Sequence, residues 1–225
     1  YNVKVVDLNQ DSYQYRYEYF NGNAVINGNG LEFRGHEKVT VTNPDGTYTE
    51  TTYLQGAWDK GRVNNSCTYE PGGQRISCVD NYYVITELPE VQAATWLGHA
   101  WVYLAIQTQR VYDADGVFAG GTRTEYSYES AYGNMVEKRE YGNPTGGTPY
   151  RVTTISYNFT NTDSLYLVSL PARQTMTANG VMKADVLYYY NYSPYSTAPP
   201  TANLVTMTRS QVNGTQYAQI NMAYD

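Results

Sequence analysis

Apolar and polar residues alternate along much of the chain, and turn-forming dipeptides interrupt the alternation at short intervals. In residues 38–42, for example, Val39 and Val41 fall on one face of an extended strand and the two threonines fall on the other. Asn, Asp and Gly reach the positive φ of a two-residue hairpin loop at little cost, so such dipeptides between alternating runs are typical of β-hairpins. They are Asn29-Gly30, Asp45-Gly46, Gly72-Gly73, Asp115-Gly116, Asn179-Gly180 and Asn213-Gly214, with Gly146-Gly147 a looser case. The pattern predicts an all-β fold of consecutive antiparallel hairpins, with little or no helix.

Two segments depart from this alternation. Apolar residues recur at helical spacing over 93–105, but residues 101–112 continue without a break into a β-rich stretch, so we expect a loop or one helical turn near 89–98 and then a strand. Residues 191–200 contain three prolines, which remove backbone donors and preclude a central strand. We expect a hairpin array over 1–190, a loop or linker at 191–200, and a further hairpin at 201–225 that continues the array.

Composition and charge narrow the class of protein. The chain has 26 Tyr but only 4 Phe and 3 Trp, and a tyrosine can pack its ring against neighbouring strands while its hydroxyl stays in water. The formal net charge is −6 and no run of Lys or Arg occurs, so nucleic acid is not an expected partner. The longest apolar stretch, 93–106, is shorter than the roughly 20 residues of a membrane-spanning helix. The chain opens on Tyr1 without a signal pattern, so we expect a processed product or a segment of a longer protein.

The two cysteines are equidistant from the Gly72-Gly73 dipeptide. A two-residue turn there places Cys67 and Cys78 directly opposite one another, with Cα atoms about 4.5–5.5 Å apart, which suits a disulfide. We interpret the pair as a cross-strand disulfide of an exported protein; the alternative is two reduced, half-buried thiols in a cytosolic protein. The short loop means that the bond would fix the strand register more than it would add stability.

Candidates for catalysis and metal binding are few. Neither His36 nor His99 has a nucleophile or carboxylate at a recognisable catalytic spacing, and two cysteines with two distant histidines do not make a zinc site. The Asp113-x-Asp115-Gly116 sequence has its glycine at the fourth position, whereas an EF-hand loop needs it at the sixth. Carboxylates that a glycosidase could use are Glu87, Glu90, Glu125, Glu129, Glu137 and Glu140, but solvated strand faces explain them as well. We therefore expect no catalytic, cofactor-binding or metal-ligating residue.

One stretch resembles the YD repeat of Rhs, insecticidal Tc toxin B-type and teneurin-like proteins. The core of that repeat is a Tyr-x-Tyr-Asp strand end, a Gly-Asn turn and an alternating return strand. Here Tyr126 and Tyr128 end the strand, Gly133-Asn134 forms the turn, and Glu129 stands where the repeat usually has Asp. Tyr112-Asp113 and Tyr224-Asp225 resemble partial copies.

The resemblance extends over residues 13–225. Tyr13-Gln-Tyr-Arg-Tyr17, followed by Glu32-Phe33-Arg34-Gly35 and the Asp45-Gly46 hairpin, looks like a segment of Rhs and Tc B-type proteins. Leu170-Pro171-Ala172-Arg173 and the hairpin after it match the spacing of the same family.

What the resemblance implies is a long antiparallel strip that curls into a hollow shell. In those relatives the shell is secreted or displayed on the cell surface, and in many it encloses a toxic C-terminal domain. This sequence has no separate effector domain after its hairpins and no Asp-Pro-x-Gly cleavage signature, so we expect a segment of the scaffold rather than the effector.

The leading hypothesis is a non-enzymatic structural scaffold of an extracellular or cell-surface protein, without a cofactor. Its partners would be the rest of its own longer chain or identical copies, bound through strand edges, and an enclosed effector domain. An alternative is a carbohydrate-binding module in which exposed tyrosines with Trp58, Trp96 and Trp101 stack on sugar rings of a glycan. A third possibility is a glycoside hydrolase, which a panel of chromogenic glycosides would reveal.

Overall fold

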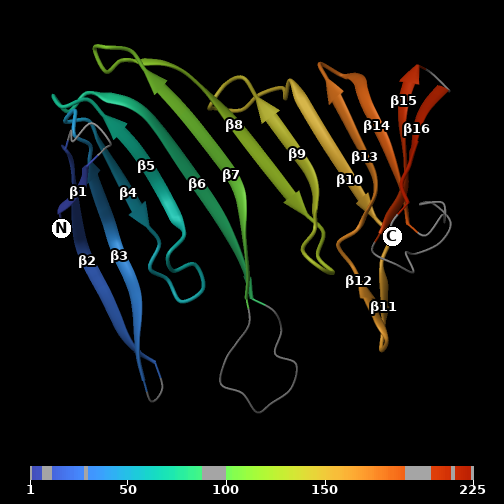
Figure 1. Cartoon of the computed structure of the whole chain (residues 1–225), viewed down its shortest axis with the longest axis horizontal. Helices are drawn as coiled ribbons and strands as arrows, with labels where there is room; N and C mark the ends of the chain where they lie inside the picture. The colour runs from blue at the N-terminus through green and yellow to red at the C-terminus, as the bar shows by residue number, and fades with distance from the viewer. Residues whose placement is uncertain are drawn as a thin grey trace. The chain divides into compact units, whose positions relative to one another are not determined.

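The computed structural model describes residues 2–6, 12–27, 30–87, 100–190, 204–213 and 216–223, and within them the chain is all β (Figure 1). The strands of the main sheet pair antiparallel in chain order, so the predicted fold class of consecutive hairpins is confirmed. The possible helical turn at 89–98 and the linker at 191–200 lie outside the described residues. The chain divides into unit 1, Tyr1–Arg123 with Asn143–Thr145, and unit 2, Thr124–Gly142 with Gly146–Asp225.

Unit 1 is a sheet in which each strand pairs with the next along the chain. The strands are β1 (Asn2–Val6), β2 (Ser12–Asn27), β3 (Gly30–Thr42), β4 (Tyr48–Tyr53), β5 (Val63–Tyr69), β6 (Arg75–Glu87), β7 (Ala100–Tyr112) and β8 (Phe118–Tyr128), which passes into unit 2. Among the described elements, β2 to β7 contact only the strands beside them. The described strands of unit 1 therefore belong to a single sheet.

Unit 2 is also a sheet in which each strand pairs with the next along the chain, apart from one inserted hairpin. Its strands pair in the order β8, β9 (Met135–Tyr141), β10 (Arg151–Tyr157), β13 (Pro171–Ala178), β14 (Val181–Tyr190), β15 (Val205–Asn213) and β16 (Gln216–Asn221). A separate small hairpin, β11 (Thr160–Thr162) with β12 (Leu165–Leu167), is inserted between β10 and β13. Buried apolar side chains form a small core here: Tyr141, Val168, Ala172, Leu187, Tyr189 and Tyr190.

Three predicted two-residue loops have a different geometry. At Asp45-Gly46 the Gly46 N–H donates to Asn43 O (3.0 Å), the Asn43 N–H donates to Thr47 O (2.8 Å), and Gly46 has φ of 86°. This is a type I turn followed by a glycine bulge, because Pro44 at the first central position has the φ of a type I turn and not of type I′. Gly72-Gly73 and Asp115-Gly116 repeat the same hydrogen bonds, with Gly73 and Gly116 at positive φ.

The Asn179-Gly180 loop has the geometry that was predicted. Ala178 pairs directly with Val181, and the two loop residues have φ of 49° and 76°, as a type I′ turn requires. Gly146-Gly147 instead lies in the longer loop 142–150 between β9 and β10. Asn29 and Gly214 lie outside the described residues.

The disulfide between Cys67 and Cys78 joins β5 to β6, with 4.1 Å between the two Cα atoms. Cys67 and Cys78 face one another, as the sequence analysis expects. The Gly72-Gly73 turn differs from the expected turn, but a register shift between Thr68 and Tyr69 compensates for the difference. The two side chains are 5% and 4% exposed. In the described part of unit 1 they are the only buried apolar side chains.

Among the tyrosines of the unit 2 core, Tyr190 has the pKa that lies furthest from its ordinary value. Its side chain is 6% exposed and its hydroxyl donates to Pro171 O (2.9 Å). Burial, assisted by Tyr188 and Tyr157, raises the pKa of Tyr190 to about 12.

We expect the wild-type protein to show no reactive thiol when titrated in denaturant without reductant. A Cys67→Ala, Cys78→Ala double variant should unfold at lower denaturant concentration, with a loss of at most about 3 kcal/mol because the closed loop is short. Two reactive thiols in the wild type would contradict the disulfide, and an unchanged denaturation midpoint in the double variant would contradict its contribution to stability.

We expect the free energy of unfolding to fall at alkaline pH, because ionisation of Tyr190 destabilises the folded state. An unfolded tyrosine titrates near pH 10, so the contribution is complete below pH 10 and is lost as the pH rises through about 12. The full loss is on the order of 3 kcal/mol. Denaturant unfolding followed from pH 8 to 12 should show a shallower decline for Tyr190→Phe than for the wild type, whereas Tyr166→Phe, with a 64% exposed side chain, should behave like the wild type. Equal profiles for all three proteins would refute the assignment.

Candidate functional site

The turn between β8 and β9 contains the best match to the YD repeat. Glu129 directly follows β8, its N–H donates to Asn134 O (3.0 Å), and Gly133 has φ of 76°. The sequence therefore places a carboxylate at the first position of a tight turn that glycine closes.

The Glu129 carboxylate holds this turn together. It accepts hydrogen bonds from the backbone N–H groups of Ala131, Tyr132 (2.9 Å) and Asn134 (3.0 Å), and from the Asn134 side-chain amide (2.9 Å). Burial raises the pKa of Glu129, but the backbone donors outweigh burial and hold the pKa below its ordinary value. A carboxylate that accepts this many bonds is committed to capping the turn.

Asn134 and Tyr132 connect the turn to the inserted hairpin. The Asn134 amide also donates to Val168 O (2.7 Å). The Tyr132 ring packs edge-on against Phe159 at 4.7 Å and against Tyr166 at 6.2 Å between ring centroids. The Gly-Asn turn thus anchors β11, β12 and the segment that leads into β13.

The partial copy at Tyr112-Asp113 uses the same chemistry. The Asp113 carboxylate accepts from the backbone N–H groups of Asp115 (3.0 Å) and Val117 (2.8 Å). The Tyr112 ring packs edge-on against Phe118 at 6.2 Å, and the Arg75 guanidinium lies 5.9 Å from its centroid. In both turns a strand-ending tyrosine precedes a carboxylate that caps the turn. Tyr224 and Asp225 lie outside the described residues.

The Leu170-Pro171-Ala172-Arg173 stretch opens β13 and pairs its arginine with a buried aspartate. Arg173 donates two hydrogen bonds to Asp185 (2.7 and 2.8 Å), whose side chain is 3% exposed. Ala172, the preceding residue, is 4% exposed. The sequence analysis did not identify Asp185; the available signal is a single acidic residue inside the otherwise uncharged segment 184–190 of β14.

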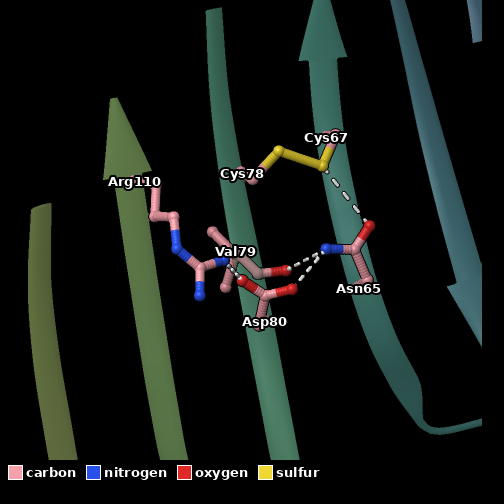
Figure 2. Close-up of polar contacts among 6 residues, drawn as sticks. All are labelled: Asn65, Cys67, Cys78, Val79, Asp80 and Arg110. Atoms are coloured by element: carbon pink, nitrogen blue, oxygen red, sulfur yellow. Dashed lines mark hydrogen bonds and ion pairs between the residues drawn. A yellow bond between two sulfur atoms is a disulfide. The ribbon is translucent and has the colours of Figure 1, made fainter. Parts of the chain in front are cut away.

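A polar cluster surrounds the disulfide on one face of unit 1 (Figure 2). The Asn65 amide on β5 donates to the Asp80 carboxylate on β6 (2.7 Å), and Asp80 forms an ion pair with Arg110 on β7. The Cys67 sulfur lies 3.3 Å from Asn65 Oδ1; because a bonded sulfur carries no hydrogen, this is a contact and not a hydrogen bond. The cluster connects β5, β6 and β7.

The described carboxylates among the glycosidase candidates have structural partners. Glu125 accepts from the Tyr141 hydroxyl (2.7 Å), and Glu137 pairs with Arg139 (2.8 Å). Glu140 is bound by Arg151 and by Lys138, and the Arg151 hydrogen bonds hold the pKa of Glu140 below its ordinary value. The side chain of Glu87 and the whole of Glu90 lie outside what the structure describes.

Among the described residues, the histidine and the tryptophans do not converge on a common site. The His36 ring packs against Tyr19 at 5.1 Å and Phe33 at 5.5 Å between centroids. Trp58, 38% exposed, lies in the loop between β4 and β5, whereas Trp101 is in β7, with β5 and β6 intervening in the strand order. His99 and Trp96 are outside the described residues. Within the described residues there is no metal-binding cluster of His, Cys, Asp and Glu, and no helix that could cross a membrane.

Comparisons by sequence give no relative. No protein-family model matches the chain, and no curated protein matches it significantly.

Solved structures share the fold. The crystal structure of TcdB2-TccC3 without its hypervariable C-terminal region matches 93% of this chain with a TM-score of 0.71 and 11% identity. The crystal structure of TcdB2-TccC3 matches 96% of the chain at a TM-score of 0.63 and 11% identity, and the Photorhabdus luminescens Tc holotoxin pore matches 88% at 0.66 and 10% identity. The chain spans 15–16% of the length of these structures. It therefore has the fold of a part of the Tc toxin structures.

Proposed function

We propose that this chain is a non-enzymatic scaffold, a segment of a YD-repeat shell or fibre of an exported or cell-surface protein. The observation that carries the proposal is that each strand of the main sheet pairs with the next one in its order, interrupted among the described strands only by the inserted β11–β12 hairpin. A wall built of successive hairpins needs this connectivity, because each repeat buries a face that it could not bury alone.

Two further observations support the YD-repeat part of the proposal. The Tyr-Glu turn at Glu129 and the Tyr-Asp turn at Asp113 share one capping chemistry, although they lie in different hairpins. The similarity to TcdB2-TccC3 extends over most of the chain while covering about one sixth of that structure. A repeated unit within a longer wall accounts for both.

In this proposal, four acidic residues have structural roles. Glu129 and Asp113 cap turns, while Glu140 and Asp185 pair with arginines across neighbouring strands. A retaining or inverting glycosidase needs two carboxyl groups that converge on a substrate. Carboxylates already saturated by backbone N–H groups and guanidinium groups are poor candidates for that role.

The edge of β16 is where the scaffold would meet its partners. β16 is the terminal strand of the order in unit 2, and five of its six side chains are exposed. An unpaired strand edge recruits another strand by backbone hydrogen bonding. The partner would be the next hairpin of a longer chain or, for the isolated chain, another copy. The disulfide supports an exported location, and an enclosed effector domain would be a partner of the complete shell.

We expect the isolated chain to self-associate through this edge, because an unpaired strand edge recruits another strand. Ile220→Lys places a charge on the β16 edge and should weaken this association several-fold in sedimentation velocity. Val181→Lys is the matched control, since Val181 is 57% and Ile220 63% exposed but Val181 lies in the interior strand β14. A wild-type chain that sediments as a single monomer would contradict the edge role.

We expect Glu129→Ala to lower the unfolding free energy by about 1–3 kcal/mol, because it leaves several backbone donors of the turn without their acceptor. Glu129→Asp should retain most of the stability, since a shorter carboxylate can cap the turn, as Asp113 does. The contribution should be present at neutral pH and lost as the pH falls below the ordinary glutamate range, because the folded-state pKa is lowered.

The control for this prediction is Glu137→Ala. Its ion pair with Arg139 lies on the surface, with side chains 25% and 48% exposed, and such pairs contribute at most about 1 kcal/mol. Urea denaturation of the four proteins at pH 7 and pH 4 provides the measurement. Equal effects of the Glu129→Ala and Glu137→Ala substitutions would show that Glu129 does not cap the turn.

A further inference from the structure

Two tyrosines from separate elements of unit 2 meet at the inserted hairpin. Tyr132 belongs to the turn between β8 and β9, and Tyr166 is the middle residue of β12. Their rings lie edge-on, with 6.2 Å between the centroids and 82° between the ring planes. Within the described sheets β12 pairs only with β11, so no backbone ladder holds the two tyrosines at a fixed spacing.

Both rings are within reach of the solvent. Tyr166 is 64% exposed, and the Tyr132 hydroxyl accepts a hydrogen bond from the exposed Asn161 amide (3.2 Å). Asn161 is paired directly with Tyr166 in the β11–β12 hairpin. The bond therefore holds the hydroxyl end of Tyr132 next to the strand pair that carries Tyr166, while Phe159 packs against the Tyr132 ring at 4.7 Å between centroids.

The hairpin at this contact is small. β11 and β12 have three residues each, and they form a sheet of their own at the end of β10 (Figure 1). A two-stranded hairpin is at best marginally stable by itself, so its position depends on contacts such as the one between Tyr132 and Tyr166. A covalent bond between these rings would fasten the hairpin to the β8–β9 turn.

We propose that Tyr132 and Tyr166 form an oxidative cross-linking site, at which a one-electron oxidant joins the two phenols into a dityrosine. Phenol rings lose single electrons more readily than most other side chains, and the disulfide between Cys67 and Cys78 suits an oxidising compartment. The inference rests on the geometry of this pair and does not depend on the proposed scaffold function.

The reaction removes two electrons and two protons from the pair. Each hydroxyl gives one electron to the oxidant and its proton to water, and the resulting radical is shared between the oxygen and the two ring carbons beside it. A carbon–carbon bond then forms between one of these carbons on each ring. The hydrogen on each bonded carbon leaves as a proton while the oxygen regains one, which restores both hydroxyls. With a peroxidase as the oxidant, the electrons and protons pass to hydrogen peroxide, which becomes two molecules of water.

A second pair of tyrosines provides an internal comparison. Tyr48 and Tyr69 stack more closely, with 4.8 Å between centroids, but they face one another on adjacent strands of the ladder. Directly paired residues have Cβ atoms about 4.5–5.5 Å apart, whereas a bond between the ring carbons beside the hydroxyls needs the two Cβ atoms further apart. The ladder therefore prevents this pair from coupling, while the separate elements of Tyr132 and Tyr166 can adjust.

The test exposes the full chain, at low micromolar concentration, to photogenerated tris(bipyridyl)ruthenium(III), a small one-electron oxidant. The monomer is isolated on a denaturing gel, reduced and digested with trypsin, which cuts after Lys and Arg. Mass spectrometry then looks for the peptides 124–138 and 152–173, which contain Tyr132 and Tyr166, joined and lighter than their sum by two hydrogens. Tyr166→Phe keeps the ring but removes the phenol, and Tyr157→Phe is the matched control in the same peptide. Circular dichroism establishes that each variant is folded.

We expect the joined peptides in the wild type and in Tyr157→Phe, because Tyr157 lies in β10 with its hydroxyl bonded to Met135 O (3.1 Å). Tyr166→Phe should lose them. The oxidised wild type should also unfold at a higher denaturant concentration than equally oxidised Tyr166→Phe, because the cross-link closes a loop in the unfolded chain.

Three results would overturn the proposal. The first is a wild type without the joined peptides, and the second is a Tyr166→Phe variant that retains them. The third is a stronger link between 39–60 and 63–75, the peptides of Tyr48 and Tyr69, because ring stacking and not backbone freedom would then decide which pair couples. Equal denaturation midpoints for the two oxidised proteins would contradict the fastening of the hairpin.

Discussion

The hydrogen-bonded ladder between each strand and the next is the interaction on which the rest of this structure depends. In the described part of unit 1 the only buried apolar side chains are the two cysteines of the disulfide. Cohesion must therefore come from backbone pairing and from cross-strand contacts, such as the stacked rings of Tyr48 and Tyr69, whose centroids are 4.8 Å apart. Such pairs contribute roughly 0.2–1 kcal/mol each, so the sheet needs many strands and a single register.

Register is secured at the turns and at the one covalent link. A slip of one residue would move every side chain of a strand to the other face. Glycines at positive φ and carboxylates bound to backbone N–H groups hold the turns. The disulfide holds β5 and β6 in place beside a register shift. The same features that specify the fold thus account for the acidic residues, and they favour a scaffold over an enzyme.

The fold class could be predicted because turn dipeptides and period-two alternation are local signals. The facing cysteines were predictable for the same reason, but the type of turn between them was not. Pro71 favours a type I turn with a glycine bulge, and the strand register therefore shifts next to the Thr68–Ser77 pair, one residue pair away from Cys67. The Arg173–Asp185 pair could not be predicted, because it depends on which strands become neighbours after the β11–β12 insertion.

The central claim is that this chain forms part of a wall of consecutive hairpins. The most direct measurement is a cryo-electron microscopy map of the longest natural protein that contains these residues. The account predicts a hollow body whose wall is a continuous antiparallel sheet, with this segment entering the wall strand by strand in chain order. A solid globular body, in which these strands line a cleft with converging carboxylates, would contradict it.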